Sequence, residues 1–458
     1  MPIVAIIGAG FSGVATAVHL ARLPWPRGVR IVIVERSPRF ARGVAYSTDH
    51  PLHVLNVPAG RMGALADDEG HFLRWLRLTD PSVTGDAFVA RKRYGDYLEW
   101  LLGEATANAS ANVAIERRIG DVVNVVTTDS GATLTFRDGA PIEADRVVLA
   151  LGNLPPRDPR GTTRLHGDAR YVPDPWAPDA LKRLPKTTQP IVMIGSGLTM
   201  VDAVLALRDH GHVTGFVAVS RHGLLPHSHR DWPAKPPVVD PPRELENWDG
   251  SAAALVRMVR EAAKAAARAG LDWRDVVNGL RPITPQLWHR MSSSERERFL
   301  RHVRPYWDTH RHRMSTRVAE SINQLIARRE LSIVAGRVAE VTPAAKSITV
   351  GVVPRGGGAI EPFEAGALVN CTGPGAFGSS SDPLVNALCQ SGSLDPDPFG
   401  LGFMSDHDGA VLSQRGRPSS GLFTLGSPRR LADWESTAVP ELRAQADRLS
   451  RRLRDSLH

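Results

Sequence analysis

Three glycines close to the N-terminus, Gly8, Gly10 and Gly13, have the spacing of a loop that binds the pyrophosphate of a dinucleotide. Gly8 permits a tight turn after a strand, Gly10 lets the backbone approach the pyrophosphate where a Cβ would collide, and Gly13 lets the following helix pack closely on the strand. Phe11 and Ser12 lie at the start of that helix, whose free N–H groups attract phosphate. We expect all five residues to line a phosphate-binding loop; a glycine turn without a ligand is the alternative.

The segments around these glycines predict the elements that such a loop needs. Residues 3–7 (IVAII) are typical of a parallel strand buried on both faces, and residues 29–34 predict a second strand that closes with Glu35. Glu35 can accept hydrogen bonds from both ribose hydroxyls, and its charge repels a 2′-phosphate. We therefore expect FAD or NAD rather than NADP at this site, with Glu35 and the adjacent Arg36 among the cofactor-binding residues.

A second glycine turn follows residues 190–194 (PIVMI), another predicted strand. Gly195, Ser196, Gly197 and Thr199 take the places of cofactor-binding residues, but Met200 stands where the third glycine usually lies. Because Met200 has a side chain, we expect the helix and the strand to pack slightly further apart here.

The strand predicted at residues 216–219 ends in Ser220 and Arg221 instead of an acid. A guanidinium at that position can form a forked pair of hydrogen bonds with a 2′-phosphate, which favours NADPH over NADH. Two alternatives remain. Arg221 pairs with a surface carboxylate and NADH serves, or the second fold binds no nucleotide.

Three further glycines follow predicted strands and are assigned to the cofactor sites. They are Gly152, Gly373 and Gly426, after the runs 146–151, 367–372 and 421–425. The first two resemble the junctions at which two-dinucleotide flavoproteins cross between domains. The third resembles the segment that brings a final strand to the flavin phosphates and ribityl chain, although Ser427 replaces the acid that usually follows.

These patterns together predict an α/β fold with two Rossmann-like dinucleotide-binding domains and a helical insertion, with FAD in the first domain and NADPH in the second. We expect residues 1–185 to form the first part of the FAD-binding domain and residues 331–458 its returning part. Residues 186–330 are the predicted NAD(P)H-binding domain, with the insertion at about 240–330. Strands at 333–341 and 347–353 are expected to form a small antiparallel piece before the return.

Histidines and arginines gather in two segments, of which the first directly follows the second predicted nucleotide site. The first holds Arg221, His222, His227, His229 and Arg230, and we expect its histidines, if protonated at mildly acidic pH, to strengthen NADPH binding.

The second segment contains His310 and His312 among several arginines. Apart from Asp308, no carboxylate or cysteine is there to complete a ligand set, so no metal site is predicted. A structural network of Arg and His around a packed Trp307 is the favoured interpretation, and a basic lining for an acidic ligand or a cofactor phosphate is the alternative.

The composition is that of an ordinary globular protein. Of 458 residues, 42% are hydrophobic and 23% charged, and no run of about 20 apolar residues occurs, so we expect no membrane span. The net charge of +8 is spread along the chain, which argues against a nucleic-acid partner. The two cysteines, Cys371 and Cys389, form no CxxC motif, which favours reduced thiols in the cytoplasm. The oligomeric state stays open.

Several short motifs along nearly the whole chain resemble a known family. They are residues 43–46 (GVAY), 53–59 (HVLNVPA), 93–97 (RYGDY), 194–202 (IGSGLTMVD), 220–226 (SRHGLLP), 307–313 (WDTHRHR) and 434–443 (WESTAVPELR). They are similar to a bacterial family of mostly uncharacterised FAD/NAD(P)-binding flavoproteins, distantly related to the flavin-dependent N-hydroxylating monooxygenases.

The resemblance implies roles for residues that the nucleotide patterns leave unassigned. The loop around Asn56 and Val57 is expected beside the isoalloxazine, and Arg93 is expected to line the FAD site. An Asn56 that only caps a turn before Pro58 is the alternative, and His53 is expected to be packed or solvent-facing rather than catalytic.

The resemblance also implies an FAD enzyme that takes hydride from NADPH and hydroxylates a small substrate, at an amine nitrogen. An NAD(P)H:acceptor oxidoreductase without oxygenation and a non-catalytic FAD-binding protein are the alternatives. The cofactor carries the difficult chemistry in such enzymes, and we assign no catalytic side chain.

Overall fold

The first glycine turn follows β1, the central strand of a six-stranded sheet. In the computed structural model, which describes residues 1–128, 131–230 and 239–457, the strand order is β15-β16-β7-β1-β2-β3. The strands are β1 (Ile3–Ile7), β2 (Val29–Glu35), β3 (Val113–Ile119), β7 (Arg146–Leu149), β15 (Ala410–Leu412) and β16 (Pro418–Thr424). All neighbours are parallel except β15 and β16. Val4, Ala5 and Ile6 of β1 are fully buried, as expected for an interior parallel strand.

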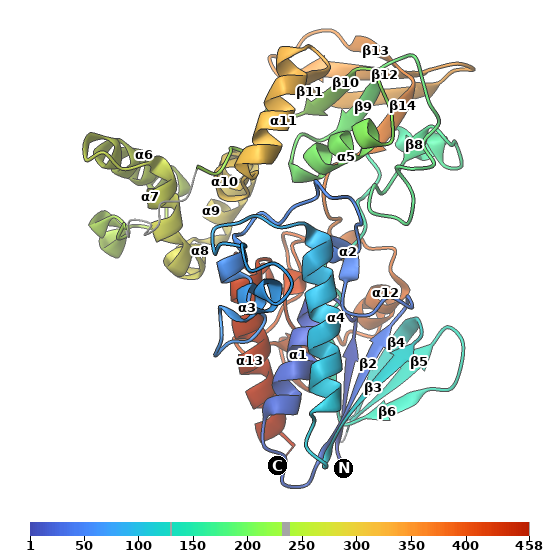
Figure 1. Cartoon of the computed structure of the whole chain (residues 1–458), viewed down its shortest axis with the longest axis vertical. Coiled ribbons are helices and arrows are strands. Elements are labelled where there is room, and N and C mark those ends of the chain that lie inside the picture. Colours follow the sequence, from blue (N-terminus) through green and yellow to red (C-terminus); the bar gives the residue numbers. More distant parts are fainter. Residues whose placement is uncertain (129–130, 231–238, 458) are drawn as a thin grey trace. The chain divides into compact units, whose positions relative to one another are not determined.

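Helices flank this sheet, and a small sheet packs beside it (Figure 1). The helices are α1 (Phe11–Arg22), α2 (Gly43–Tyr46), α3 (His71–Arg77), α4 (Arg91–Ala107), α12 (Pro383–Gln390) and α13 (Val439–Asp455), with short turns η1 (Ala59–Arg61), η6 (Phe377–Ser379) and η7 (Ser427–Arg429). The small antiparallel sheet consists of β4 (Val122–Thr127), β5 (Ala132–Phe136) and β6 (Ile142–Ala144). α1 packs against both α4 and α13.

The second glycine turn follows β9, which lies inside a seven-stranded sheet of order β13-β12-β11-β10-β9-β14-β8. The strands are β8 (Tyr171–Val172), β9 (Ile191–Ile194), β10 (Phe216–Ser220), β11 (Leu331–Pro343), β12 (Ile348–Pro354), β13 (Glu361–Ala365) and β14 (Ala367–Asn370). β8, β14, β9, β10 and β11 run parallel, and β12 and β13 continue antiparallel. α5 (Leu198–Asp209) and α11 (Thr316–Ala327) contribute to its core, and η2 (Thr162–Leu165) contacts β11.

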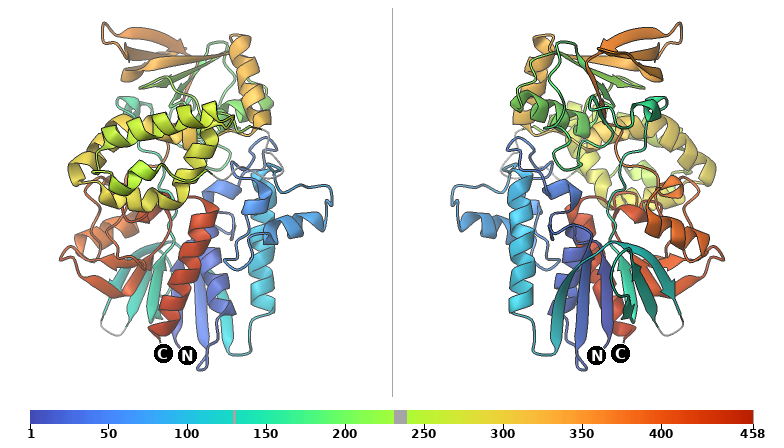
Figure 2. Two further views of the ribbon diagram at one scale, coloured as in Figure 1. Left: turned by 90° about the vertical axis from the view of Figure 1, so that its left-hand side faces the viewer. Right: turned by 90° about the vertical axis from the view of Figure 1, so that its right-hand side faces the viewer.

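Between β10 and α11 the chain forms the predicted helical insertion, whose helices gather together in yellow-green in Figure 2. They are η3 (Arg243–Asn247), α6 (Ala252–Arg268), α7 (Trp273–Leu280), η4 (Arg281–Ile283), α8 (Thr284–Arg290), α9 (Ser293–Arg298), the π-helical turn η5 (Phe299–Val303) and α10 (Arg304–Arg311). Ser251 and Ser292 cap α6 and α9 by accepting backbone N–H groups three residues on. Asp272 and Asp275 form a capping box at α7.

The structure divides the chain at other positions than the boundaries predicted at 185/186 and 330/331. One unit comprises residues 1–51, 57–154 and 375–458, and the other comprises 52–56 and 155–374. Residues 155–185 belong to the second unit because β8 pairs with β14. Residues 331–374 belong there because β11 is the parallel partner of β10, a pairing between distant segments that periodicity does not reveal. The same division separates Asn56 from Val57.

Each glycine turn lies where its sheet reverses the direction in which strands are added. In the first sheet β2 and β7 flank β1, and in the second β10 and β14 flank β9. Ligands of open α/β sheets bind at the carboxyl ends of the strands at such switch points. Among the described residues no helix is long and apolar enough to cross a membrane.

Candidate functional site: two nucleotide-binding turns

The first turn contains two glycines that the fold requires and one that leaves room. Gly8 has φ +103°, and a Cβ on it would clash with the carbonyl oxygen of Ala150. A Cβ on Gly13 would clash with the Gly8 carbonyl oxygen. On Gly10, by contrast, a Cβ would have no protein neighbour nearer than the Cα of Gly43, at 3.5 Å. The N-terminal end of α1 is therefore open beside Gly10, as a bound pyrophosphate requires.

Glu35 ends β2 and connects that strand to the glycine turn. Its carboxylate accepts hydrogen bonds from the backbone N–H of Ala9 at 2.9 Å and of Ser37 at 3.2 Å. Each carboxylate oxygen can accept more than one hydrogen bond, so the side chain is able to receive ribose hydroxyls without leaving these partners. Arg36 instead points to the surface, with 60% of its side chain exposed and an ion pair of 3.7 Å to Asp382.

Two of the family-like motifs, 43–46 and 93–97, meet beside this turn. Gly43, at φ +53°, approaches Gly10 so closely that a Cβ on it would lie 3.1 Å from the Gly10 Cα. A Cβ on Gly95 of α4 would lie 2.7 Å from the carbonyl oxygen of Tyr46, and Arg42 pairs with Asp96 and Glu99 of the same helix at 2.6 Å. α4 thus holds α2 beside Gly10. The nucleotide patterns did not identify this support, and family resemblance was its only signal.

Arg93, Gly152 and Gly426 lie in different surroundings within the first unit. Arg93 donates to the Thr79 hydroxyl at 2.8 Å and lies 5.9 Å from the Trp75 ring, so its contacts are with α3 and the segment after it. Gly152 has φ +65° and follows β7, whereas Gly426 has φ +80° and follows β16. A Cβ on Gly426 would lie 3.0 Å from the Ser12 hydroxyl, which places the end of β16 against the start of α1.

The second turn repeats the arrangement of the first. Gly195 has φ +115°, and a Cβ there would clash with the carbonyl oxygen of Cys371. A Cβ on Gly197 would meet no atom within 4 Å, which again leaves open space at a helix N-terminus, here that of α5. Met200, in the place of the third glycine, is fully buried in the core of the second unit. Gly373, at φ +84°, also has open space beside it, while Thr199 lies in the first turn of α5.

Serine hydroxyls connect the second turn to the end of β10. The Ser196 hydroxyl lies 2.7 Å from that of Ser220 and 2.5 Å from the carbonyl oxygen of Leu224. The Ser220 hydroxyl also accepts the backbone N–H of Gly223 at 3.1 Å. Ser196 and Ser220 therefore stabilise the segment that leads into Arg221.

Arg221 is exposed, and within the described part of the chain it forms no ion pair or hydrogen bond. His222 packs its ring 5.8 Å from that of Tyr306, whose hydroxyl accepts a 3.4 Å hydrogen bond from Arg355. Burial and the neighbouring Arg355, Arg221 and His302 lower the pKa of His222. We call Arg221, His222, Tyr306 and Arg355 the strand-end basic cluster. The sequence pointed to Arg221 and His222 but not to Tyr306 and Arg355, which come from the insertion and from the segment that follows β12.

The structure disfavours protonation of these histidines, on which the expected gain in NADPH binding depends. Burial, with Arg313 nearby, lowers the pKa of His229 to about 4. Burial, with His310, Arg274 and Arg313 close, also lowers that of His227. Cations that surround a half-buried imidazole disfavour a further positive charge.

The network in the insertion is centred on Trp273, not on Trp307 as predicted. The rings of His227 and His310 lie 5.1 and 4.8 Å from that of Trp273, and the guanidinium groups of Arg274 and Arg313 lie over it at 4.4 and 5.3 Å. Trp307 is only partly buried. No group of metal-ligating side chains occurs among the described residues.

Asn56, which is expected beside the isoalloxazine, and His53 both belong to the second unit, where they form backbone and packing contacts. The carbonyl oxygen of Asn56 lies 3.1 Å from His229 Nε2. His53 is buried, with Nε2 2.9 Å from the carbonyl oxygen of Asp202 and its ring edge-on to Trp176. His53 is therefore a packed residue, as expected.

The lowered pKa of His229 predicts a pH-dependent stability. Below pH 6.5 the unfolded chain protonates this histidine while the folded chain does not, so the free energy of unfolding should fall between pH 6.5 and about 4, by about 1–3 kcal/mol for this group. His229→Gln should remove that part of the loss. Urea unfolding at pH 7 and pH 4.5 measures it, with His407→Gln, whose side chain is 80% exposed, as the control. Equal pH dependence in the wild type and His229→Gln would contradict the prediction.

Comparison with known proteins agrees with this geometry. Residues 5–154 match a protein family described as FAD-NAD(P)-binding. No curated protein sequence matches the chain. Among solved structures, ornithine hydroxylase from Pseudomonas aeruginosa matches with a TM-score of 0.68 at 16% identity, with 100% of both chains covered.

Two further structures are similar at the level of fold. The ornithine N-hydroxylase of Kutzneria sp. 744, with reduced FAD, NADP⁺ and L-ornithine, gives a TM-score of 0.67 at 16% identity and 99% coverage of both chains. A cadaverine monooxygenase from Erwinia amylovora, bound to FAD, gives 0.65 at 14% identity, with 98% of this chain and 93% of that chain covered. Residues 5–154 are therefore similar to a FAD-NAD(P)-binding family, and the chain shares the fold of these flavoprotein hydroxylases.

Proposed function

We propose that this protein is an FAD-dependent oxidoreductase that uses NADPH to reduce the flavin and hydroxylates a small substrate at an amine nitrogen. The observation that carries the proposal is the pair of glycine turns at the switch points of two sheets, one beside a strand-end acid and one beside a strand-end basic cluster. An acid disfavours a 2′-phosphate and a guanidinium recruits one. This contrast assigns FAD to the first turn and NADPH to the second.

The residues of each turn fit these assignments. The open space beside Gly10 and at Gly197 would be lost to a Cβ, and both positions lie at helix N-termini that attract phosphate. Gly8, Gly10, Phe11, Ser12, Gly13 and Glu35 would hold the pyrophosphate and ribose of FAD. Gly195, Ser196, Gly197, Thr199, Ser220 and Arg221 would hold NADPH. FAD bound in the first turn would supply hydride acceptance and oxygen activation.

The other site assignments remain part of the proposal. Gly152, Gly373 and Gly426 follow strands and would line the cofactors, and Asn56 and Val57 would lie beside the isoalloxazine. Arg36 and Arg93 are the less well supported cofactor-binding residues, because the side chain of Arg36 is exposed and Arg93 contacts Thr79 and Trp75.

The choice of an amine substrate is supported by the structural neighbours. Ornithine and cadaverine, named for three of them, carry primary amines. We further propose a cytoplasmic location, which the unpaired state of Cys371 and Cys389 supports.

Anaerobic and aerobic assays of the purified holoprotein test the proposal. We expect yellow protein, bleaching of its flavin absorbance by NADPH, and, in air, hydroxylamine formed from a member of an amine panel (L-ornithine, L-lysine, cadaverine) in step with NADPH consumption. Colourless protein that FAD cannot reconstitute would contradict flavin binding. Hydrogen peroxide equal to the NADPH consumed with every amine would favour the acceptor oxidoreductase instead.

A further inference from the structure

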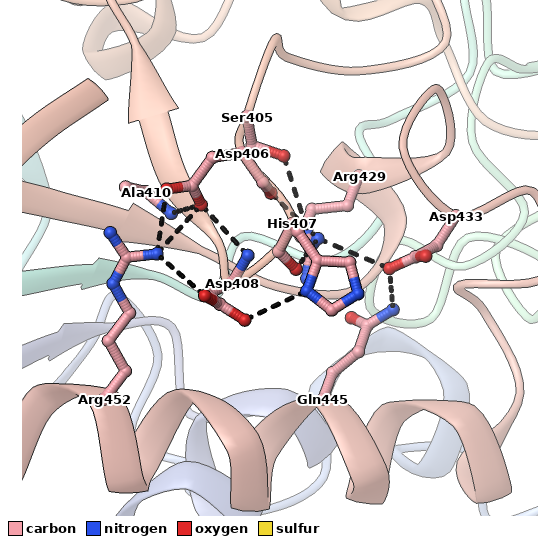
Figure 3. Close-up of polar contacts among 9 residues, drawn as sticks. All are labelled: Ser405, Asp406, His407, Asp408, Ala410, Arg429, Asp433, Gln445 and Arg452. Atoms are coloured by element: carbon pink, nitrogen blue, oxygen red, sulfur yellow. Dashed lines mark hydrogen bonds and ion pairs between the residues drawn. The ribbon is translucent and has the colours of Figure 1, made fainter. Parts of the chain in front are cut away.

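Four residues near the end of β16 form a closed ring of polar contacts, drawn in part in Figure 3. The Gly426 N–H donates to Oε1 of Gln445 at 2.9 Å, and Nε2 of Gln445 donates to Asp433 at 3.1 Å. Asp433 pairs with the Arg429 guanidinium at 3.4 Å. The Arg429 N–H then donates to the Gly426 carbonyl oxygen at 2.8 Å. We call Gly426, Arg429, Asp433 and Gln445 the Gly426 ring.

Gly426, Arg429 and Gln445 of the Gly426 ring are buried, Asp433 is half-buried, and their polar groups are paired. Gln445 is 3% exposed and Arg429 is 2% exposed. Arg429 also donates to the Ser405 hydroxyl and to the carbonyl oxygens of Asp406 and His407, at 3.3, 3.1 and 2.8 Å. Buried polar groups are retained only when they are paired, and such networks hold one backbone arrangement over others.

A second set of contacts supports residues 405–409, the loop to which Arg429 donates its hydrogen bonds. Arg452 of α13 pairs with Asp406 at 2.8 Å and with Asp408 at 3.6 Å (Figure 3). Gly409, in the same loop, accepts the N–H of Thr424 at 2.7 Å. The end of β16 is therefore tied to α13 both directly, through Gln445, and indirectly, through this loop.

The Gly426 ring supports the first glycine turn. Gly426 has φ +80°, and a Cβ on it would lie 3.0 Å from the Ser12 hydroxyl and 3.2 Å from the Leu442 side chain. Gln445 lies on the buried face of α13 with Leu442 and Ala446, where an apolar side chain would satisfy packing. Its amide instead forms hydrogen bonds with the Gly426 N–H and with the Asp433 carboxylate, and these bonds fix the orientation of Gly426.

We propose that Gln445 is a positioning residue that holds the Gly426–Ser427 turn, through Asp433 and Arg429, in the orientation that receives the ribityl and phosphate groups of FAD. The proposal rests on the proposed function of the first turn. Ser427 stands where an acid is usual after the glycine. The nearby carboxylate of Asp433 does not contact Gly426 directly but is connected to it through the Gln445 amide.

The test exploits the fact that glutamine presents an acceptor to Gly426 and a donor to Asp433. Gln445→Glu keeps the acceptor but sets a second carboxylate against Asp433. We expect its FAD Kd to rise about 10- to 100-fold at pH 8, and to recover substantially at pH 5.5, where the two carboxyls share a proton. The wild-type Kd should change much less over this range.

A double variant restores the pairing with reversed polarity. In Gln445→Glu/Asp433→Asn the new carboxylate accepts from Gly426 and from the new amide, and one negative charge remains near Arg429. We expect its FAD Kd to return to within about threefold of the wild type. If Gln445→Glu does not fold, Asp433→Ala breaks the ring without touching Gly426 and should raise the Kd about 3- to 10-fold.

FAD titration of apoprotein by flavin fluorescence, with urea unfolding of the same apoprotein, separates positioning from general stability. The control is Ser450→Ala on the same helix, which removes a buried 3.2 Å hydrogen bond to the Thr16 carbonyl oxygen outside the ring. The control should lose stability but keep its FAD Kd. Wild-type protein that binds no FAD would overturn the proposed function. FAD binding by the wild type with no pH-dependent loss in Gln445→Glu, or no rescue by the double variant, would overturn the positioning role.

Discussion

Arg221→Ala should raise the KM for NADPH by about 30- to 100-fold, equivalent to roughly 2–3 kcal/mol, and leave the KM for NADH nearly unchanged. The reason is that Arg221 is exposed at the end of β10 with no partner of its own among the described residues, so its fork of N–H groups is available to a 2′-phosphate. NADH has no 2′-phosphate and gains nothing from that contact. The predicted result is therefore a loss of cofactor preference, not a general loss of activity.

Steady-state oxidation of NADPH and NADH by the two proteins measures this effect. Arg183→Ala is a suitable control, because that side chain is 74% exposed and belongs to the same unit. A second variant, Arg221→Glu, should reverse the preference by reproducing the strand-end acid of the first turn. Equal losses with NADPH and NADH would show that Arg221 does not recognise the 2′-phosphate.

Gly195→Ala and Gly197→Ala, two residues apart, should fail for different reasons. Alanine at Gly195 would be strained at φ +115°, and its Cβ would clash with the Cys371 carbonyl oxygen. We expect a loss of about 3 kcal/mol or more in the free energy of unfolding. Gly197 has φ −83°, and its Cβ would meet no protein atom within 4 Å, so that variant should fold with a change below about 0.5 kcal/mol.

NADPH affinity, by contrast with stability, should be reduced strongly by Gly197→Ala. In Gly197→Ala the methyl group occupies space that the pyrophosphate of NADPH needs, and we expect the NADPH Kd to rise about 100-fold while FAD remains bound. Urea unfolding and titration of the holoprotein with NADP⁺ measure the two effects. A stable Gly197→Ala variant with normal NADPH affinity would contradict the assignment of a nucleotide to the second turn.

Local patterns sufficed to predict both glycine turns and most strands around them. Residues 3–35 contain strand, turn, helix, strand and terminal acid in order, and the structure has β1, α1 and β2 in those places. Residue type and near neighbours decide such elements: β-branched runs favour buried strands, and only glycine accepts the φ of Gly8 and Gly195.

Pairings between distant segments were not accessible in this way. The segment that forms β11 was expected in a separate antiparallel piece. Its alternation of apolar and polar residues is the same whether or not β10 lies beside it. The lowered pKa values of His227 and His229 were inaccessible for a related reason, since they depend on burial and on Arg274 and Arg313, which come from other parts of the chain.

The amino-acid sequence by itself determined where the two glycine turns lie and which strand-end residue, Glu35 or Arg221, distinguishes them. Only the tertiary structure decided what surrounds them: Gly43 against Gly10, Tyr306 and Arg355 beside His222, and Gln445 on the N–H of Gly426. The physical reason is that a turn is set by the steric limits of a few consecutive residues. Its supports are set by side chains that come together only when separate helices and strands pack into one core.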